Sequence, residues 1–105
     1  MGQARSETVI DTGLKYGPDD PVSVRVVRRG HRISVTDDGA ATKKAGRPQG
    51  WREAAELVAE LDVNISQRGV ISLPVVPVGP GEQKIVGRIG EASLCLYEAI
   101  LELQD

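Results

Sequence analysis

The sequence has few aromatic side chains and an abundance of branched aliphatic ones. Phe is absent, and Trp51, Tyr16 and Tyr97 are the only aromatic residues. Val, Ile and Leu together make up 28 of 105 residues, a proportion typical of a folded chain rather than a disordered one. The composition therefore predicts a single domain over residues 1–105 with an aliphatic core. Its first residues, 1–7, are expected to be frayed.

Cysteine and histidine occur once each, as Cys95 and His31. A single cysteine excludes an intramolecular disulfide and a zinc site built from cysteines, and it suits a reducing cytosol. A nucleophile with its base would need His31 beside Cys95 or a serine, whereas a lone histidine facing inward on a hairpin is more often structural. The sequence also lacks the glycine-rich motifs that cradle phosphates. We therefore expect no catalytic residue, no metal site and no cofactor.

No run of about 18 apolar residues is present that could span a membrane, and the start lacks the apolar core of a secretory signal. The sequence therefore predicts a cytoplasmic protein without a membrane partner.

Charge is distributed unevenly along a chain whose formal net charge is −2. Residues 21–52 hold eight Lys or Arg against two Asp, whereas residues 53–105 hold three against nine Asp or Glu. Such polarity can bring a nucleic acid or an acidic partner to one face, or let two copies meet head to tail. Solvated faces give the same pattern, so the asymmetry alone does not choose between these interpretations.

Alternation in "VSVRVVRRGHRISV" predicts a β-hairpin with a two-residue turn at Arg29-Gly30. This register places Val26 opposite Ile33 and directs one apolar set toward the core, namely Val22, Val24, Val26, Ile33 and Val35. An earlier strand is expected over residues 8–16, followed by a turn in "GPDDP".

The segment "VNISQRGVISL" predicts a second hairpin. Its turn is expected over residues 67–69 with a left-handed glycine, which pairs Ile65 with Ile71. Pro74 and Pro77 follow and cannot donate to a ladder, so the second strand of this hairpin should be an edge strand or end early.

Between the hairpins, Asp37 and Asp38 end a strand, and Gly39 opens "GAATKKAG". The alanines of this segment favour a helix, and its lysines lie toward the C-terminal end, where a cation is stabilising. We expect Asp38 or Asp37 to cap this helix. A metal or acid–base site is the alternative, but neighbouring side chains that leave a strand point to opposite faces and do not easily converge on one ion.

Two amphipathic helices follow. The first covers "WREAAELVAELD", with Trp51 as a core anchor, and the second covers residues 85–104. The second has a seam of core positions at Ile85, Ile89, Ala92, Leu96, Ala99 and Leu103, and its apolar arc covers about 220° at 100° per residue. One sheet cannot cover so wide an arc. The helix therefore lies between two layers of its own domain or offers a face to another chain, and we favour a homodimer through Leu94, Tyr97, Leu101, Gly87 and Gly90.

Together these elements predict an α+β fold, in which an antiparallel sheet of about five strands, with two hairpins, packs against two to three helices, the last of them long and C-terminal. The order of elements over residues 22–104 resembles an uncharacterised family of small bacterial and phage proteins. This order is strands, a Val-Thr-Asp-Asp-Gly turn, a helix, the segment "DVNISQRGVISL" and an apolar final helix. The family has no established activity. The insert "GRPQG" with Trp51 belongs to a narrower group. More distantly, the order is similar to type III secretion chaperones, small acidic dimers that bind other proteins, although their leading helix has no counterpart here.

The predicted function is a non-enzymatic protein-interaction module, homodimeric or bound to another protein, with a regulatory or chaperone-like role. The alternative is a nucleic-acid-binding protein, because basic residues gather on the outer face of the first hairpin and just after it. These are Arg25, Arg29, Arg32, Lys43, Lys44 and Arg47. A sequence pI near 5.4 and the lack of aromatic residues among these arginines count against the alternative.

Overall fold

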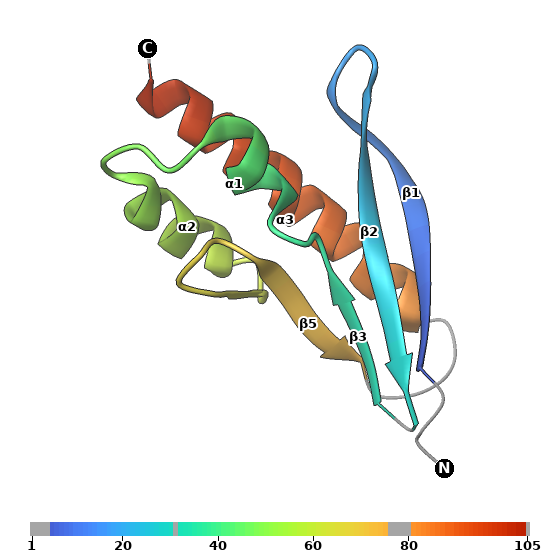
Figure 1. Cartoon of the computed structure of the whole chain (residues 1–105). Helices are drawn as coiled ribbons and strands as arrows, with labels where there is room; N and C mark the ends of the chain where they lie inside the picture. The colour runs from blue at the N-terminus through green and yellow to red at the C-terminus, as the bar shows by residue number, and fades with distance from the viewer. Residues whose placement is uncertain (1–4, 31, 76–80, 105) are drawn as a thin grey trace.

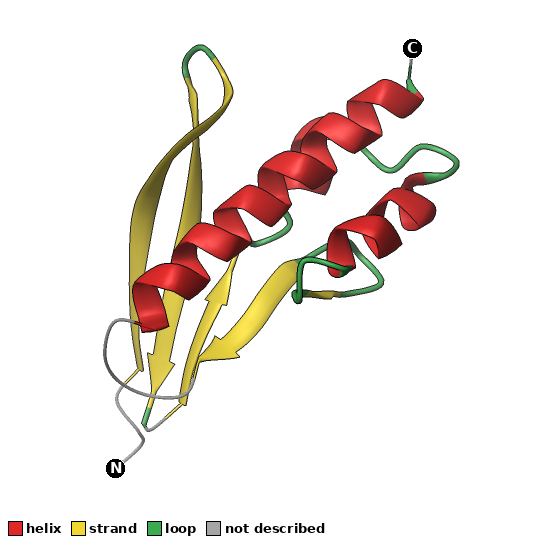
Figure 2. Ribbon diagram, turned by 180° about the vertical axis from the view of Figure 1, so that it is seen from behind, coloured by secondary structure: helices red, strands yellow, loops and turns green. Residues whose placement is uncertain are grey.

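The computed structural model describes residues 5–30, 32–75 and 81–104 and has the predicted α+β fold. Five antiparallel strands form one sheet in the order β1-β2-β3-β5-β4. The strands are β1 (Arg5–Gly17), β2 (Asp20–Arg29), β3 (Arg32–Thr36), β4 (Asn64–Ile65) and β5 (Ile71–Val75), and the helices are α1 (Ala40–Ala45), α2 (Trp51–Ala59) and α3 (Gly81–Leu103). In Figure 2, α3 crosses one face of the sheet, while Figure 1 shows the opposite face of the sheet with no described helix across it.

The hairpin of β2 and β3 keeps the predicted inward face but has a different register. Arg29 lies opposite Arg32 and Val26 opposite Val35, so the predicted pair of Val26 with Ile33 is wrong. The turn begins one residue later because Gly30 takes a φ of 60°, which a residue without Cβ adopts readily. The shift moves every pairing by two residues and preserves the faces, so all five predicted inward residues are buried. The predicted inward position of His31 lies outside the described residues.

The first strand is longer than predicted. β1 begins at Arg5, so a frayed start is wrong for residues 5–7, while residues 1–4 lie outside the described part. Pairing with β2 runs from Arg5 to Asp11 and satisfies those backbone groups of this segment that face β2. Beyond Asp11 the register shifts, and Gly13 has a φ of 83°. This irregularity bends the rest of the hairpin, whose tip is the predicted turn in "GPDDP".

The second hairpin has the predicted register. Ile65 lies opposite Ile71, and Gly69 is left-handed with a φ of 87°. β5 lies between β3 and β4 in the sheet order, so the edge-strand alternative is wrong. The other alternative, an early end, stays a prediction, because residues 76–80 lie outside the described part. β4 pairs with only the first two residues of β5, so Pro74 lies past its end, where no described strand requires its missing N–H. Pro77 lies outside the described residues.

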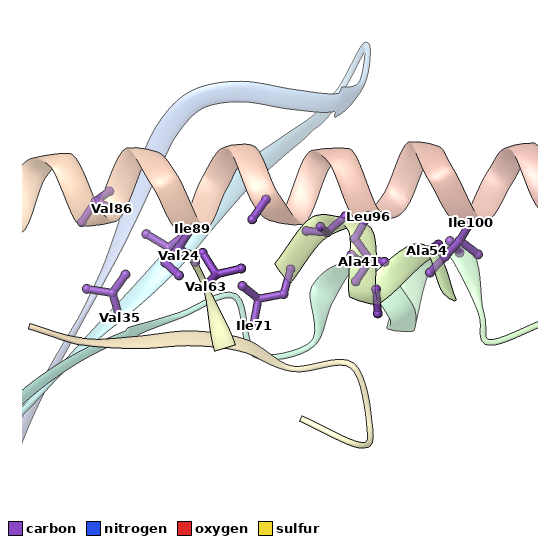
Figure 3. Packing of buried hydrophobic residues seen from close by; sticks show 14 of the residues in the cluster. Val24, Val35, Ala41, Ala54, Val63, Ile71, Val86, Ile89, Leu96 and Ile100 are labelled. Atoms are coloured by element: carbon purple, nitrogen blue, oxygen red, sulfur yellow. The ribbon is translucent and has the colours of Figure 1, made fainter. Parts of the chain in front are cut away.

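The core lies between the covered face of the sheet and the three helices. Figure 3 shows side chains of α3, including Ile89, Leu96 and Ile100, directed toward residues of the sheet, α1 and α2. These three residues are fully buried, as predicted for Ile89 and Leu96, whereas Leu103 at the end of the predicted seam is 45% exposed. Trp51 is partly buried against this core at the start of α2.

The wide apolar arc of α3 is largely covered by its own chain. The α3 helix contacts β1, β2, β3 and β5 of the sheet as well as both α1 and α2. Gly90 lies against Thr12 of β1, and the Tyr97 ring packs edge-on to Tyr16 with the ring centroids 5.0 Å apart. Of the two alternatives drawn from the sequence, packing between layers of one domain therefore accounts for most of the arc.

Candidate functional site

The five residues predicted at a protein interface have different environments in the structure. Gly90 is buried, and a Cβ placed there would lie 2.8 Å from Thr12 Cγ2, so this glycine serves close packing within the chain. Tyr97 is partly buried beside Tyr16. Gly87 and Leu94 are partly buried, and Leu101 is 38% exposed. Gly90 therefore serves packing within the chain, and Tyr97 does so in part, whereas Gly87, Leu94 and Leu101 are the better candidates for contact with another molecule.

These three residues form a strip along α3 on the side that borders β1. Gly90 and Tyr97 mark the direction in which α3 faces β1, because both touch that strand. At 3.6 residues per turn, the mean direction of Gly87, Leu94 and Leu101 lies about 50° around the helix axis from the mean direction of Gly90 and Tyr97. They succeed one another every seven residues and are hence stacked on one face. We call this strip the α3 flank.

Next to the α3 flank lies the outer edge of β1. β1 is the first strand in the sheet order, and within the described chain no strand pairs with its outer side. The regular stretch from Arg5 to Asp11 ends at the irregularity around Gly13. Val9, in the middle of this stretch, is 68% exposed. Such an edge carries a row of backbone N–H and C=O groups able to accept another strand.

The basic residues predicted to bind nucleic acid do not form one face. Arg25 is bound to Asp38, and its Nη1 lies 3.4 Å from a carboxylate oxygen of Glu7. Lys44 donates to Asp20 at 2.8 Å, and its ammonium group lies 5.2 Å from the centre of the Tyr16 ring. The positive charge of both residues is thus partly neutralised by carboxylates of the same chain.

The other four predicted residues separate into two pairs. Arg29 and Arg32 lie opposite each other at the turn end of the β2–β3 hairpin. Lys43 and Arg47 lie beyond the other end of β3, where they line a hollow. The length of β3 lies between the two pairs. A continuous basic stripe, as expected for a nucleic-acid backbone, is therefore not formed by these residues.

The hollow near Lys43 contains a third cation that the sequence analysis missed. It has a volume of about 350 Å³ and is lined by Lys43, Arg47 and Arg68 together with Asp38, Gly39, Thr42 and Val70. Arg68 comes from the turn between β4 and β5, more than 20 residues from Arg47 in the sequence. Its position beside α1 depends on tertiary packing, and no local pattern of the sequence indicates it.

Neither Asp37 nor Asp38 is the N-cap residue of α1, although the Asp37 carboxylate accepts the N–H of Gly39 at the start of this helix. The N-cap of α1 is Gly39, which supplies no side-chain hydrogen bond. Asp37 continues the inward alternation of Ile33 and Val35 and is only 3% exposed. Asp38 points the other way, takes a φ of 58° and binds Arg25. The prediction of a helix cap is wrong for Asp38, because its carboxylate binds Arg25 from the turn that follows β3.

Asp37 is the centre of a buried hydrogen-bond network that joins four elements. Its Oδ1 accepts the N–H groups of Gly39 at 2.8 Å and Ile71 at 2.9 Å. Its Oδ2 accepts the Ser93 hydroxyl at 2.7 Å, and the Ser93 Oγ lies 2.6 Å from the Tyr16 hydroxyl oxygen. The network links the starts of α1 and β5 to the middle of α3 and to β1. Every bond named here goes to a group of the chain itself, which is the arrangement of a structural carboxyl.

Burial raises the pKa of Asp37 above its ordinary value of 3.8, because desolvation disfavours the charged carboxylate. The hydrogen bonds from Ser93 and from the N–H groups of Ile71 and Gly39 oppose this shift without cancelling it. Burial likewise raises the pKa of Tyr16, which the nearby carboxylates of Asp37 and Asp20 raise further. Both groups thus hold their protons more firmly than they would in water.

We expect Asp37→Asn to change how stability depends on pH. A raised folded pKa means that the stabilisation from the neutral carboxyl is fully present below about pH 3.8 and is lost as the pH rises through the folded pKa. The amide cannot ionise, so the free energy of unfolding of Asp37→Asn should increase relative to the wild type as the pH is raised from 3.8 toward 7. Urea denaturation followed by Trp51 fluorescence at several pH values measures this difference.

Asp38→Asn is the matched control for that experiment, since it removes one negative charge from the adjacent, more exposed residue. A difference between Asp37→Asn and the wild type that stays constant over this pH range would contradict the assigned shift.

Two further observations concern groups that could bind a metal ion or react as nucleophiles. Over residues 5–30, 32–75 and 81–104, no three His, Cys, Asp or Glu side chains are grouped so that they could hold a metal ion. Cys95 lies on α3 and is exposed as a whole, although its thiol is partly shielded from water. This partial desolvation and the carboxylates of Glu98 and Glu91 raise the pKa of the thiol and disfavour the nucleophilic thiolate.

Comparison of the chain with protein-family models, with curated proteins and with solved structures finds no match. The resemblances drawn from the sequence therefore stay predictions. None of the helices that the structure describes combines the length and apolar character needed to cross a membrane.

Proposed function

We propose that the protein is a homodimeric protein-interaction module whose two copies join along the outer edge of β1 and the adjacent α3 flank. The observation that carries this proposal is the position of an open strand edge directly beside an incompletely buried apolar strip. A strand edge supplies backbone hydrogen bonds, and Leu94 and Leu101 supply apolar area. Antiparallel pairing of two β1 strands about a two-fold axis would use both features at once.

The charges on β1 favour a register centred on Thr8 over several others for this pairing. If the axis passes through Thr8, Glu7 of one copy lies opposite Val9 of the other, and no carboxylates face each other. Axes through Glu7 or Asp11 would place identical carboxylates opposite each other, and an axis through Val9 would place Glu7 opposite Asp11. Like charges at such positions are destabilising. The register centred on Thr8 thus avoids repulsion along the whole regular stretch from Arg5 to Asp11.

The same arrangement would bring the two α3 flanks toward each other. Both α3 helices would lie on the same face of a continuous sheet, because pairing about an axis perpendicular to the sheet preserves its faces. Each flank faces the outer edge of β1 and hence the partner. Gly87 would allow close approach, since a Cβ built there meets no heavy atom of the chain within 4 Å. Leu94 and Leu101 would become buried between the helices.

A pair of charge variants at Val9 tests both the dimer and its register. Val9→Glu would place a carboxylate opposite Glu7 of the partner twice, and it is expected to weaken the dimer about tenfold. Val9→Lys would place an ammonium group there instead and should retain the dimer. Both variants should fold, because Val9 is 68% exposed. Sedimentation equilibrium over a range of concentrations measures the dissociation constants.

Leu94→Glu with Leu101→Glu tests the helical part of the proposed interface and should give a folded monomer, as checked by circular dichroism. Sedimentation of the wild type as a monomer at tens of micromolar would refute the homodimer. Equal dissociation constants for Val9→Glu and Val9→Lys would show that the copies join elsewhere. Unfolding of the double leucine variant would mean that these residues belong to the core of the single chain.

A regulatory or chaperone-like role fits this proposal, because the β1 edge and the α3 flank offer area for binding another protein. The nucleic-acid alternative has weaker support from the geometry. Arg25 and Lys44 are engaged by carboxylates, and the pair at Arg29 lies apart from the pair at Lys43. The convergence of cations near Lys43 points to a smaller anion.

A further inference from the structure

The hollow lined by Lys43, Arg47 and Arg68 is held in place by close packing. Gly69 is buried against Thr42 of α1, and the Thr42 hydroxyl donates to the carbonyl oxygens of Gly39 at 3.1 Å and Arg68 at 3.3 Å. These contacts fix the turn that carries Arg68 against the helix that carries Lys43. The three cations therefore converge because two distant segments are joined there, and the convergence does not depend on the flexible side chains alone.

The charge within the hollow is positive in a chain whose net charge is −2. Among the described residues, Asp38 alone brings a carboxylate to the lining, and this carboxylate is engaged by Arg25. In the part of the chain that the structure describes, no ion pair occupies Lys43, Arg47 or Arg68. Three cations without a carboxylate partner thus face a common space.

We propose that this hollow is a binding site for a small phosphate monoester. A monoester is close to a dianion at neutral pH and has three terminal oxygens, which can meet an ammonium group and two guanidinium forks together. A volume of about 350 Å³ lies at the lower end of the range for small-molecule pockets, about 300–1,000 Å³. A carboxylate, with one charge and two oxygens, would use only part of this set.

The lining favours a small ligand over a nucleic acid. It contains no aromatic residue on which a base could stack, and Arg29 and Arg32 lie at the far end of β3. The hollow is also separate from the proposed dimer surface, because the turn with Arg68 joins β4 and β5 at the opposite side of the sheet from β1. The two proposals can therefore fail independently.

Titration of the ¹⁵N-labelled full chain with inorganic phosphate, followed by NMR, tests the site at constant ionic strength. We expect amide shift changes confined to residues 38–43, 47 and 68–70, with a dissociation constant of about 1 mM. Arg68→Gln should weaken binding about tenfold, because one charge-assisted contact is lost. Arg88→Gln is the matched control, since it removes the same charge from an exposed position of α3 and should leave the dissociation constant unchanged.

Acetate and a single-stranded DNA oligonucleotide serve as comparison ligands in the same titration. Acetate should bind at least about tenfold more weakly than phosphate. Absence of shifts up to about 20 mM phosphate, or equal binding by Arg68→Gln and the wild type, would overturn the site. Equal binding of acetate would overturn its preference for phosphate. Tighter binding of the oligonucleotide, with shift changes that extend to Arg29 and Arg32, would overturn the small ligand in favour of a nucleic acid.

Discussion

Asp37→Ala is expected to lower the free energy of unfolding by about 3–5 kcal/mol. The substitution removes the acceptor of three hydrogen bonds and leaves the N–H groups of Gly39 and Ile71 and the hydroxyl of Ser93 without this partner. Each buried donor left unpaired costs about 1–3 kcal/mol, and entry of water into the space offsets part of the sum. A domain of this size has about 5–15 kcal/mol in total, so the loss is a large fraction of its stability.

Asp37→Asn separates the hydrogen-bonding role of this residue from its charge. The amide oxygen can accept both N–H groups, and the amide nitrogen can donate to Ser93, so most of the network is retained. We expect Asp37→Asn to be at least as stable as the wild type at pH 7, in contrast to the alanine variant. Urea denaturation followed by Trp51 fluorescence compares the three proteins. A loss of less than about 1 kcal/mol in Asp37→Ala would contradict the central role of the network.

Gly69→Ala is expected to cost about 2–4 kcal/mol. Gly69 has a φ of 87°, where a residue with a Cβ is strained. A Cβ at this position would also lie 2.3 Å from Thr42 Cγ2, so the turn or α1 would have to move. The substitution combines backbone strain with overpacking at the contact that joins the second hairpin to α1.

A double variant divides this cost between its two causes. Thr42→Ser removes the methyl group nearest to the added Cβ and keeps the hydroxyl that bonds to Gly39 and Arg68. Gly69→Ala should therefore cost about 1–2 kcal/mol less in the Thr42→Ser background than in the wild type. Equal costs in both backgrounds would assign the whole effect to the backbone and contradict the steric contact.

Local alternation was enough to predict most of the fold. The inward residues of both hairpins follow from the two-residue period of a strand. The register error at Gly30 shifts the pairing by two residues and therefore leaves the same residues facing inward. The exact turn was harder to predict, because a two-residue turn at Arg29-Gly30 and one that begins at Gly30 have the same alternation. The length of β1 was underestimated because its first residues are polar, and its order comes from pairing with β2.

The candidate sites depend on contacts that the sequence only partly indicates. Asp37 continues the phase of Ile33 and Val35, and this signal could have identified it as buried; the adjacent Asp38 and the following alanines suggested a cap instead. The buried position of Gly90 and the convergence of Arg68 with Lys43 arise from tertiary packing between distant segments. Periodicity along one element carries no information about which neighbour covers it.

The two-residue length of β4 has a consequence for how far the sheet can grow. A sheet with two long open edges would allow each added copy to accept another, which leads to filaments. Here the far edge beyond β5 is bordered by a strand of only two residues, next to Pro74. Such an edge is a poor template for a further strand. If a second copy pairs with β1, growth of the sheet should stop after this one addition, because both far edges are then the short β4, and the chain should resist fibril formation at high concentration.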